Sequence, residues 1–266
     1  MAGPPIYLDY NATTPIDPAV AAAMLPYLRD HFGNPSSAHP YGVTAKEAIE
    51  QARVQVAELM NARPEEIVFT SGGSESNNTA ILGVARAHAD RGRHIITSAV
   101  EHPAVLEPCR ALAEEGYRIT VLPVDGAGRV DPDAVARAIT PETILITVMH
   151  ANNEVGTIQP IAEIGQIAAA AGVLLHTDAA QSLGKIPVAV DALGVDFLTL
   201  AGHKLYAPKG VGALYIRTGR ELPNLIHGAA HESGRRAGPK TAPSTPRASS
   251  ISTSSTPATN KSPVSG

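Results

Sequence analysis

Short apolar runs that each end in polar or glycine residues are the feature that most constrains the fold of this sequence. Such runs occur at residues 94–98, 143–149, 173–175 and 197–200, and helix-like segments separate them. Buried parallel strands are near-continuous apolar runs because helices cover both faces of their sheet. The spacing therefore predicts an α/β fold with a mostly parallel sheet, whose ligands bind at the carboxyl ends of the strands.

Composition limits the size of the fold and the kinds of partner. The 266 residues, 44% of them apolar and with a net charge of −4, can form one large α/β domain or two smaller ones. The chain has no long basic run, which argues against nucleic acid, and no apolar segment near the roughly 20 residues that a membrane helix needs. The amino terminus lacks a signal-peptide pattern, and the single cysteine, Cys109, suits a reducing compartment, so we expect a cytoplasmic protein.

Two polar residues stand out in the stretch 173–216. Asp178 follows the apolar start of one predicted strand, and Lys204 follows the strand predicted at 197–200. A lysine amine forms an imine with the aldehyde of pyridoxal 5'-phosphate (PLP), and a carboxylate keeps the pyridine nitrogen of that cofactor protonated. An isolated acid and lysine are more often surface residues, so the other motifs decide between the two interpretations.

A glycine turn between a strand-like run and a helix start forms a second motif, at residues 66–78. Small residues let the backbone approach a ligand, and the free amides at a helix start attract anions. Gly73 and Ser74 are therefore the predicted donors to the cofactor phosphate. A plain strand-to-helix connection would have the same pattern.

Two reactive side chains follow the strand predicted at 94–98. His102 is compatible with a core residue, a metal ligand or a partner that stacks on a ring. No second His or Cys lies at metal-binding spacing, so we expect no metal site. Cys109 lies in the next predicted helix, where a lone cysteine is more often a buried apolar residue than a nucleophile.

The segments Asp178-Ala-Ala-Gln181 and Gly202-His203-Lys204 resemble the cysteine desulfurase and selenocysteine lyase branch of the class V aminotransferase-like PLP enzymes. The likeness covers residues 6 to about 238 and includes an opening loop that lies at the mouth of the active site in the family. It implies the large domain of the PLP-transferase (aspartate aminotransferase-like) fold. It also gives Lys204 and Asp178 the two roles described above.

The resemblance implies four further roles around the cofactor. His102 stacks on the ring and helps to move protons, and His203 shares the phosphate with Ser74. Asn153 contacts the phenolic oxygen of the cofactor and the carboxylate of the substrate, which suits an amide because it donates without adding charge. Gln181 hydrogen-bonds the same phenolic oxygen.

The function implied by the resemblance is removal of sulfur from L-cysteine to give L-alanine and an enzyme-bound persulfide. A homodimer and a sulfur-acceptor protein are the implied partners, and the sulfur serves iron–sulfur cluster assembly or tRNA modification. Many desulfurases have a serine where this chain has Ala201, and the Ala-Gly-His-Lys variant is more similar to selenocysteine lyases, which act on L-selenocysteine. A non-catalytic remnant or dimer partner is a third interpretation.

The likeness ends abruptly at Gly238. We expect an N-terminal arm at 1–15, a PLP-binding large domain at 16–238 and a disordered tail rich in Ser, Thr and Pro at 239–266. Codons for Gly-Pro-Lys-Thr can be written so that a neighbouring reading frame gives Thr-Glu-Asn, as the family has, and our hypothesis is a frameshift of one nucleotide near Gly238. The small C-terminal domain, the catalytic-cysteine loop and the substrate-clamping arginine would then be absent. We therefore expect impaired turnover and exposed apolar surface on the large domain.

The remaining pattern predicts local elements outside the central stretch. Residues 6–15 fit a short strand followed by a turn, and helices are expected at 19–28, 44–60 and 161–171.

Overall fold

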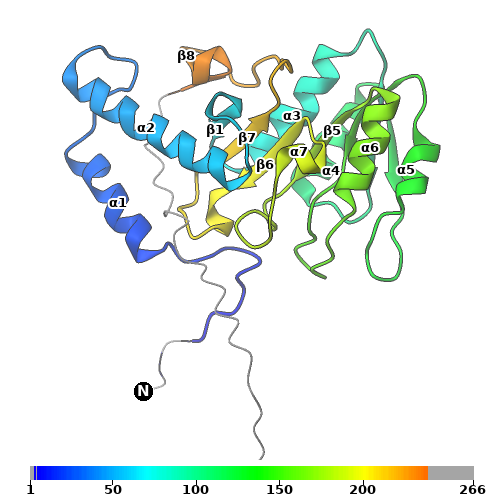
Figure 1. Cartoon of the computed structure of the whole chain (residues 1–266), viewed down its shortest axis with the longest axis horizontal. Coiled ribbons are helices and arrows are strands. Elements are labelled where there is room, and N and C mark those ends of the chain that lie inside the picture. The colour runs from blue at the N-terminus through cyan, green and yellow to red at the C-terminus, as the bar shows by residue number, and fades with distance from the viewer. Residues whose placement is uncertain (1–2, 4, 239–266) are drawn as a thin grey trace, which may run out of the picture.

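A seven-stranded sheet runs through the computed structural model, which describes residue 3 and residues 5–238 (Figure 1). The strands lie in the order β1-β7-β6-β5-β4-β2-β3. β7 pairs antiparallel with both of its neighbours, whereas the other four strand pairs are parallel. The predicted mostly parallel sheet is therefore confirmed. Its strands are β1 (Ile67–Thr70), β2 (His94–Ser98), β3 (Arg118–Leu122), β4 (Thr143–Thr147), β5 (Leu174–Asp178), β6 (Phe197–Ala201) and β7 (Gly212–Ile216).

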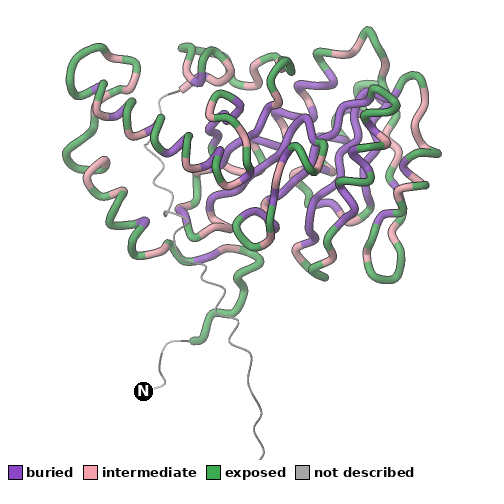
Figure 2. Tube along the Cα trace, in the orientation of Figure 1, coloured by how far each residue is buried: buried purple, intermediate pink, exposed green. Residues whose placement is uncertain are grey.

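Helices cover both faces of this sheet, as the sequence predicted (Figure 1). α3 and α4 pack on one face and α2, α5 and α6 on the other, each face with its own cluster of buried apolar residues. Figure 2 shows the strands buried between these layers. The helices are α1 (Pro18–Arg29), α2 (Pro40–Leu59), α3 (Gly73–Ala87), α4 (Pro103–Glu114), α5 (Pro132–Ala138), α6 (Ile161–Ala171) and α7 (Val190–Leu193). Shorter elements are the 3-10 turns η1 (Pro64–Glu66), η2 (Gly202–Lys204) and η3 (Glu232–Gly234) and the paired strands β8 (Ala230–His231) and β9 (Arg236–Ala237).

The central strand β5 continues beyond the apolar run at 173–175 that predicted it. Its polar residue His176 is fully buried, but both ring nitrogens are hydrogen-bonded, Nδ1 to Thr147 Oγ1 at 2.8 Å and Nε2 to Thr199 Oγ1 at 3.1 Å. Burial lowers the pKa of His176 to about 3, so the ring is neutral. Because neighbouring strands satisfy this side chain, polar residues carry the strand to the edge of the sheet.

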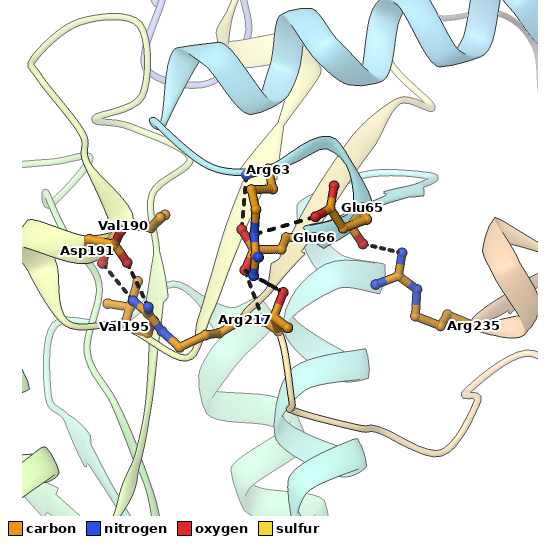
Figure 3. A network of polar contacts seen from close by, with 9 residues as sticks. Arg63, Glu65, Glu66, Val190, Asp191, Val195, Arg217 and Arg235 are labelled. Carbon is orange, nitrogen blue, oxygen red and sulfur yellow. Dashed lines mark hydrogen bonds and ion pairs between the residues drawn. The ribbon is translucent and has the colours of Figure 1, made fainter.

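A polar network closes the opposite end of the sheet, where β1 and β6 begin (Figure 3). The Glu66 carboxylate accepts hydrogen bonds from the N–H groups of Arg63 at 3.0 Å and Thr218 at 2.9 Å, and from the Thr218 hydroxyl at 3.0 Å. Burial opposes the charge of Glu66, but these hydrogen bonds outweigh burial and lower its pKa to about 2. In the same network, Arg217 Nη1 lies 2.7 Å from the Asp191 carboxylate.

The N-terminal arm differs from its prediction. Residues 6–15 contain no strand, because the backbone of this segment pairs with none of the described strands. The segment instead turns at residues 10–12 and lies against η2, where the Thr14 N–H donates to the His203 carbonyl at 2.9 Å. The predicted short strand is therefore wrong, and the arm is held by contacts that sequence periodicity does not encode.

α2 begins at Pro40, before the start of the helix predicted at 44–60. The His39 ring accepts a hydrogen bond from the Gly42 N–H at 3.3 Å, and this bond caps the helix start. Proline suits a first helical turn because its missing N–H would have no partner there. The helices predicted at 19–28 and 161–171 agree with α1 and α6.

Exposed apolar side chains concentrate in the arm, in α1 and around the start of α2. These residues are Ile6, Tyr7, Leu8, Tyr10, Ile16, Leu25, Leu28, Phe32, Tyr41 and Val43. Within the described ranges, no helix combines the length and apolar character that a membrane crossing requires. The tail predicted at 239–266 lies outside the described residues, as does the predicted frameshift junction.

Candidate active site

A cavity of about 600 Å³ opens at the carboxyl ends of the central strands. Its volume is in the range of pockets that hold small ligands. Residues of the N-terminal arm, namely Asp9, Asn11 and Ala12, complete its wall. The structure brings all eight residues selected from the sequence into this one wall: Gly73, Ser74, His102, Asn153, Asp178, Gln181, His203 and Lys204.

The turn between β1 and α3 forms one end of the cavity. Gly72 precedes the helix with φ +149°, a backbone conformation that side-chain-bearing residues rarely adopt. A Cβ atom at Gly73 would lie 3.3 Å from the Cβ atom of Ala201, so glycine keeps this corner open. The Ser74 hydroxyl and the first N–H groups of α3, at the positive end of the helix dipole, form a donor set suited to a phosphate.

Asp178 lies at the end of β5 and is buried. Its Oδ1 accepts a hydrogen bond from the Ala180 N–H at 2.9 Å, and its Oδ2 accepts one from Asn77 Nδ2 at 2.7 Å. Burial raises the pKa of Asp178, while the Asn77 donor and the charges of His102 and Lys204 oppose that rise. The carboxylate is therefore supported on both oxygens and lies where a ring N–H can reach it.

Lys204 lies in η2, directly after β6, and is half-buried. Its Nζ donates to the carbonyl oxygens of Asn11 and Ala12, the second at 2.9 Å. Burial lowers the pKa of Lys204, while the charge of Asp178 opposes that shift. A lower pKa enlarges the fraction of neutral amine, which is the nucleophilic form.

Two histidines border the cavity. His102 caps α4, because its Nδ1 accepts a hydrogen bond from the Ala104 N–H at 3.1 Å, and this bond fixes the ring. His203 Nδ1 lies 3.2 Å from Thr13 Oγ1, and burial lowers the pKa of His203 with help from the charge of Lys204. Among the described residues, Nε2 of each ring has no hydrogen-bond partner, so both rings can serve a ligand.

The amide side chains of Gln181 and Asn153 are already engaged by neighbours. Gln181 Nε2 donates to the Asn11 carbonyl at 2.9 Å, and its Oε1 accepts from Lys185 Nζ at 2.8 Å. Asn153 Nδ2 donates to Glu154 Oε1 at 2.6 Å. Each amide nitrogen carries a second hydrogen, so each still offers a donor to an oxygen in the cavity.

Two buried polar residues beside the site had no predicted role of their own, Asn77 and Glu101. Glu101 directly precedes His102, and its Oε1 accepts hydrogen bonds from Ser98 Oγ at 2.5 Å and the Met149 N–H at 2.9 Å. Burial raises the pKa of Glu101 to about 8, so its carboxyl is mostly protonated at pH 7. The acid beside His102 was the available signal, but one of its partners, Met149, lies beyond the end of β4, and no pattern in the sequence indicates that contact.

Cys109 lies in α4 and is 2% exposed. Burial raises the pKa of its thiol to about 12. The structure therefore agrees with the interpretation of Cys109 as a packed apolar residue and not as a nucleophile.

The chemistry of this donor set fits PLP. The Asp178 carboxylate suits a pyridine N–H, and the Lys204 amine suits an aldehyde. The start of α3, with Ser74 and His203, suits a phosphate dianion, and Gly73 leaves space that a Cβ atom would narrow.

Comparison with known proteins places the chain in a family. The family described as aminotransferase class V matches residues 6–248, which extends past residue 238, where the likeness was expected to end. A cysteine desulfurase IscS from Dictyoglomus turgidum is 56% identical over 233 residues, which cover 88% of this chain and 59% of that protein. A cysteine desulfurase from Mus musculus is 51% identical over 237 residues, covering 88% and 52%. The chain thus spans less than two thirds of the length of these relatives.

Solved structures agree with this assignment. A NifS-like protein superposes with a TM-score of 0.87 at 41% identity, covering 90% of this chain and 66% of that one. SspA in complex with cysteine superposes with a TM-score of 0.87 at 46% identity, covering 89% and 69%. The predicted PLP-transferase fold is therefore confirmed. The chain belongs to the class V aminotransferase family of PLP enzymes, and its relatives are cysteine desulfurases.

Proposed function

We propose that this chain carries the cofactor-binding part of a PLP-dependent cysteine desulfurase, which moves the sulfur of L-cysteine to a cysteine thiol and so gives L-alanine and an enzyme-bound persulfide. Cys109, the single cysteine of this chain, is buried and does not serve as that thiol. The observation that carries the proposal is the meeting of Asp178 and Lys204, from the ends of β5 and β6, in one cavity with the start of α3. Relatives named cysteine desulfurase, at 56% and 51% identity, support L-cysteine as the substrate.

The proposed tasks follow from the position of each side chain. When bound, the cofactor draws electrons away from the carbon that carries the substrate amine. Lys204 holds the cofactor through its amine and then takes the proton from that carbon. Asp178 accepts the hydrogen of the ring nitrogen, and His102, fixed through Nδ1, presents Nε2 to move a proton at the departing sulfur. The residues around Gly73 and Ser74 hold the phosphate.

The N-terminal arm takes part in the proposed loading step. The Lys204 amine bonds to the carbonyls of Asn11 and Ala12, and Gln181 bonds to the same Asn11 carbonyl. Lys204 must leave these carbonyls before its amine can react. We therefore expect the turn of the arm to shift when the cofactor enters.

An absorbance titration with PLP tests the proposal. The wild-type chain should gain a near-visible band, and Lys204→Ala should abolish it. Lys209→Ala is the matched control, because Lys209 is exposed and lies outside the cavity wall, so this variant should keep the band. L-Alanine release from L-cysteine then tests the reaction class, and we expect this release to be slow because Cys109, the single cysteine of the chain, is buried and cannot accept the sulfur. Absence of the band in the folded wild-type chain, or its persistence in Lys204→Ala, would contradict the proposal.

A selenocysteine lyase is the second candidate, and the observation that favours it is Ala201. Ala201 lines the cavity beside Gly73, where a serine would add a donor toward the phosphate. L-Cysteine, L-selenocysteine and L-cysteine sulfinate, compared as substrates by kcat/KM, separate the two candidates. A preference for L-selenocysteine of 100-fold or more, about 2.7 kcal/mol, would favour the lyase.

We further propose a homodimer, a sulfur-acceptor protein as partner and a cytoplasmic location. The exposed apolar residues of the arm and α1 support a covering subunit, and the single cysteine suits a reducing compartment. The proposed units are an arm at 1–15 and a large domain at 16–238. Light scattering after size exclusion should give twice the mass of one chain, and a monomer at micromolar concentration would contradict the dimer.

A further inference from the structure

A buried amide side chain forms part of the cavity wall. Asn77 lies in the second turn of α3 and is 0% exposed, and it contributes to the wall of the cavity. Its Nδ2 donates to Asp178 Oδ2 at 2.7 Å. Its Oδ1 has no hydrogen-bond partner among the described residues, although it is buried.

The direction of this amide depends on the charge of its partner. An ionised carboxylate only accepts hydrogen bonds, so the amide must turn its nitrogen toward Asp178 and its oxygen away. A buried oxygen without a partner is costly and needs an explanation. The contact with Asp178 explains the unpaired oxygen of Asn77. When the amide nitrogen donates to Asp178, the amide oxygen points to a position where none of the described residues offers a donor.

We propose that Asn77 is a positioning residue that keeps the Asp178 carboxylate ionised and aimed at the cavity. The inference rests on the proposed function in that it gives Asp178 the ring nitrogen of PLP as its ligand. Asn77 acts through Asp178 and is distinct from the eight residues selected from the sequence.

The other titratable groups that face Asp178 show why this donor is needed. His102 from the start of α4 and Lys204 from η2 favour the negative charge, whereas Glu101 faces Asp178 from the segment after β2. Among these opposing influences burial is the strongest, and the Asn77 hydrogen bond is the largest contribution against it. Burial of Asp178 therefore works against ionisation, and the amide is the main group that offsets it.

Glu101 shows what Asp178 would become without Asn77. Both hydrogen bonds to Glu101 fall on Oε1, from Ser98 and Met149, and Oε2 has no partner among the described residues. Removal of Asn77 would leave Asp178 with the Ala180 N–H alone, again on one oxygen. A carboxyl supported on one side in a buried position favours its neutral form.

The test is a pH titration of Asp178 in the full chain freed of cofactor. Carboxyl ¹³C shifts of ¹³C-labelled aspartate report each titration, and the signal missing from Asp178→Asn identifies residue 178. In Asn77→Leu, which removes the amide at similar volume, the Asp178 midpoint should move to higher pH. The same variant should bind PLP about tenfold more weakly, since a hydrogen bond to a charged group is lost.

Two further variants complete the test. Asn78→Leu is the matched control: Asn78 lies in the same helix but donates to the Ser74 carbonyl and does not contact Asp178, so the Asp178 midpoint should stay near its wild-type value. Asn77→Asp places a second carboxyl against Asp178, so it should raise the midpoint further, and it serves if the leucine variant does not fold. An Asp178 midpoint that stays at its wild-type value in a folded Asn77 variant would overturn the inference.

This outcome is separate from that of the proposed function. The titration uses neither cofactor nor substrate, so a failure there leaves the desulfurase proposal standing. Conversely, a chain that never forms the near-visible band would refute the proposed function while the Asp178 midpoint still reports on Asn77.

Discussion

The two ends of the central sheet treat buried carboxyl groups differently. At the end where β1 and β6 begin, Glu66 accepts hydrogen bonds on both oxygens from Arg63 and Thr218 (Figure 3). At the carboxyl ends of the strands, Glu101 has donors on one oxygen only, and the Asn77 oxygen has none among the described residues. The pKa values agree with this difference. The pKa of Glu66 is lowered to about 2, whereas the pKa of Glu101 is raised to about 8.

The difference separates a structural end from a ligand-binding end. Glu66 uses its oxygens for the fold alone, whereas Asp178, which also has a donor on each oxygen, lines the cavity and can accept a further hydrogen bond. Polar atoms left without partners around a cavity reduce stability, and such sites are where function is found. One buried polar group at the structural end also lacks a hydrogen bond: the Tyr215 hydroxyl of β7 has no partner among the described residues.

The largest effect is expected for Asp178→Asn. This variant removes the charge that we propose faces the ring nitrogen, so PLP affinity should fall by about 10³-fold, or about 4 kcal/mol. Asp196→Asn is the control from the opposite end of the sheet. Asp196 Oδ2 accepts a hydrogen bond from the Leu175 N–H at 2.8 Å, and Asp196 lies outside the cavity wall. Cofactor titration of both variants tests the contrast, and equal losses of affinity would contradict it.

Glu66→Gln should lower the free energy of unfolding by about 3 kcal/mol at pH 7, because a native pKa of about 2 against an ordinary 4.5 stabilises the ionised form. This contribution is present above pH 4.5 and is lost as the pH falls through 2. The gap between wild type and variant in urea unfolding should therefore shrink from pH 7 to pH 3. Glu65→Gln is the control. Because the Glu65 side chain is 65% exposed, this variant should change the free energy of unfolding by less than about 1 kcal/mol. A gap that stays constant with pH would contradict this account of Glu66.

Glu101→Gln should change stability in the opposite pH range. The pKa of Glu101 is raised from 4.5 to about 8, so its contribution is complete below 4.5 and is lost as the pH rises through 8. Relative to the glutamine variant, which does not titrate, the wild type should lose about 2 kcal/mol between pH 5 and pH 6.5. Denaturant midpoints across this range measure the difference. Parallel curves would show that Glu101 is already ionised in the fold.

Ala201→Ser has the smallest expected effect. The new hydroxyl would lie beside Gly73 at the phosphate end and should tighten PLP binding by about tenfold, or about 1.4 kcal/mol. Ala201→Cys, of similar size but a weak donor, should bring no comparable gain. Unchanged affinity in the serine variant would indicate that the phosphate lies elsewhere.

The sequence predicted the buried strands and the residues at their ends because both follow from local chemistry. Asp178 and Lys204 meet because parallel strands share an edge, which topology alone guarantees. The apolar run alone underestimated the length of β5, because the strand continues through the polar residue His176. That residue is tolerated in the core because it hydrogen-bonds Thr147 and Thr199, which lie in two other strands.

Contacts between distant segments account for what the sequence did not predict. The arm was expected to form a strand from its composition, but its turn is instead held by His203 and Lys204, which come nearly 200 residues later. The contact between Asn77 and Asp178 spans 101 residues in the same way. Such pairings depend on the finished packing, which neither periodicity nor spacing contains.

Chemical trapping of the cofactor tests the ligand-binding end most directly. The chain is incubated with PLP, reduced with borohydride and digested, and the modified lysine is identified by mass spectrometry. We predict one phosphopyridoxyl group on Lys204. Stoichiometric labelling of another lysine such as Lys185 or Lys209, or no labelling of the folded chain, would contradict the assignment of this cavity.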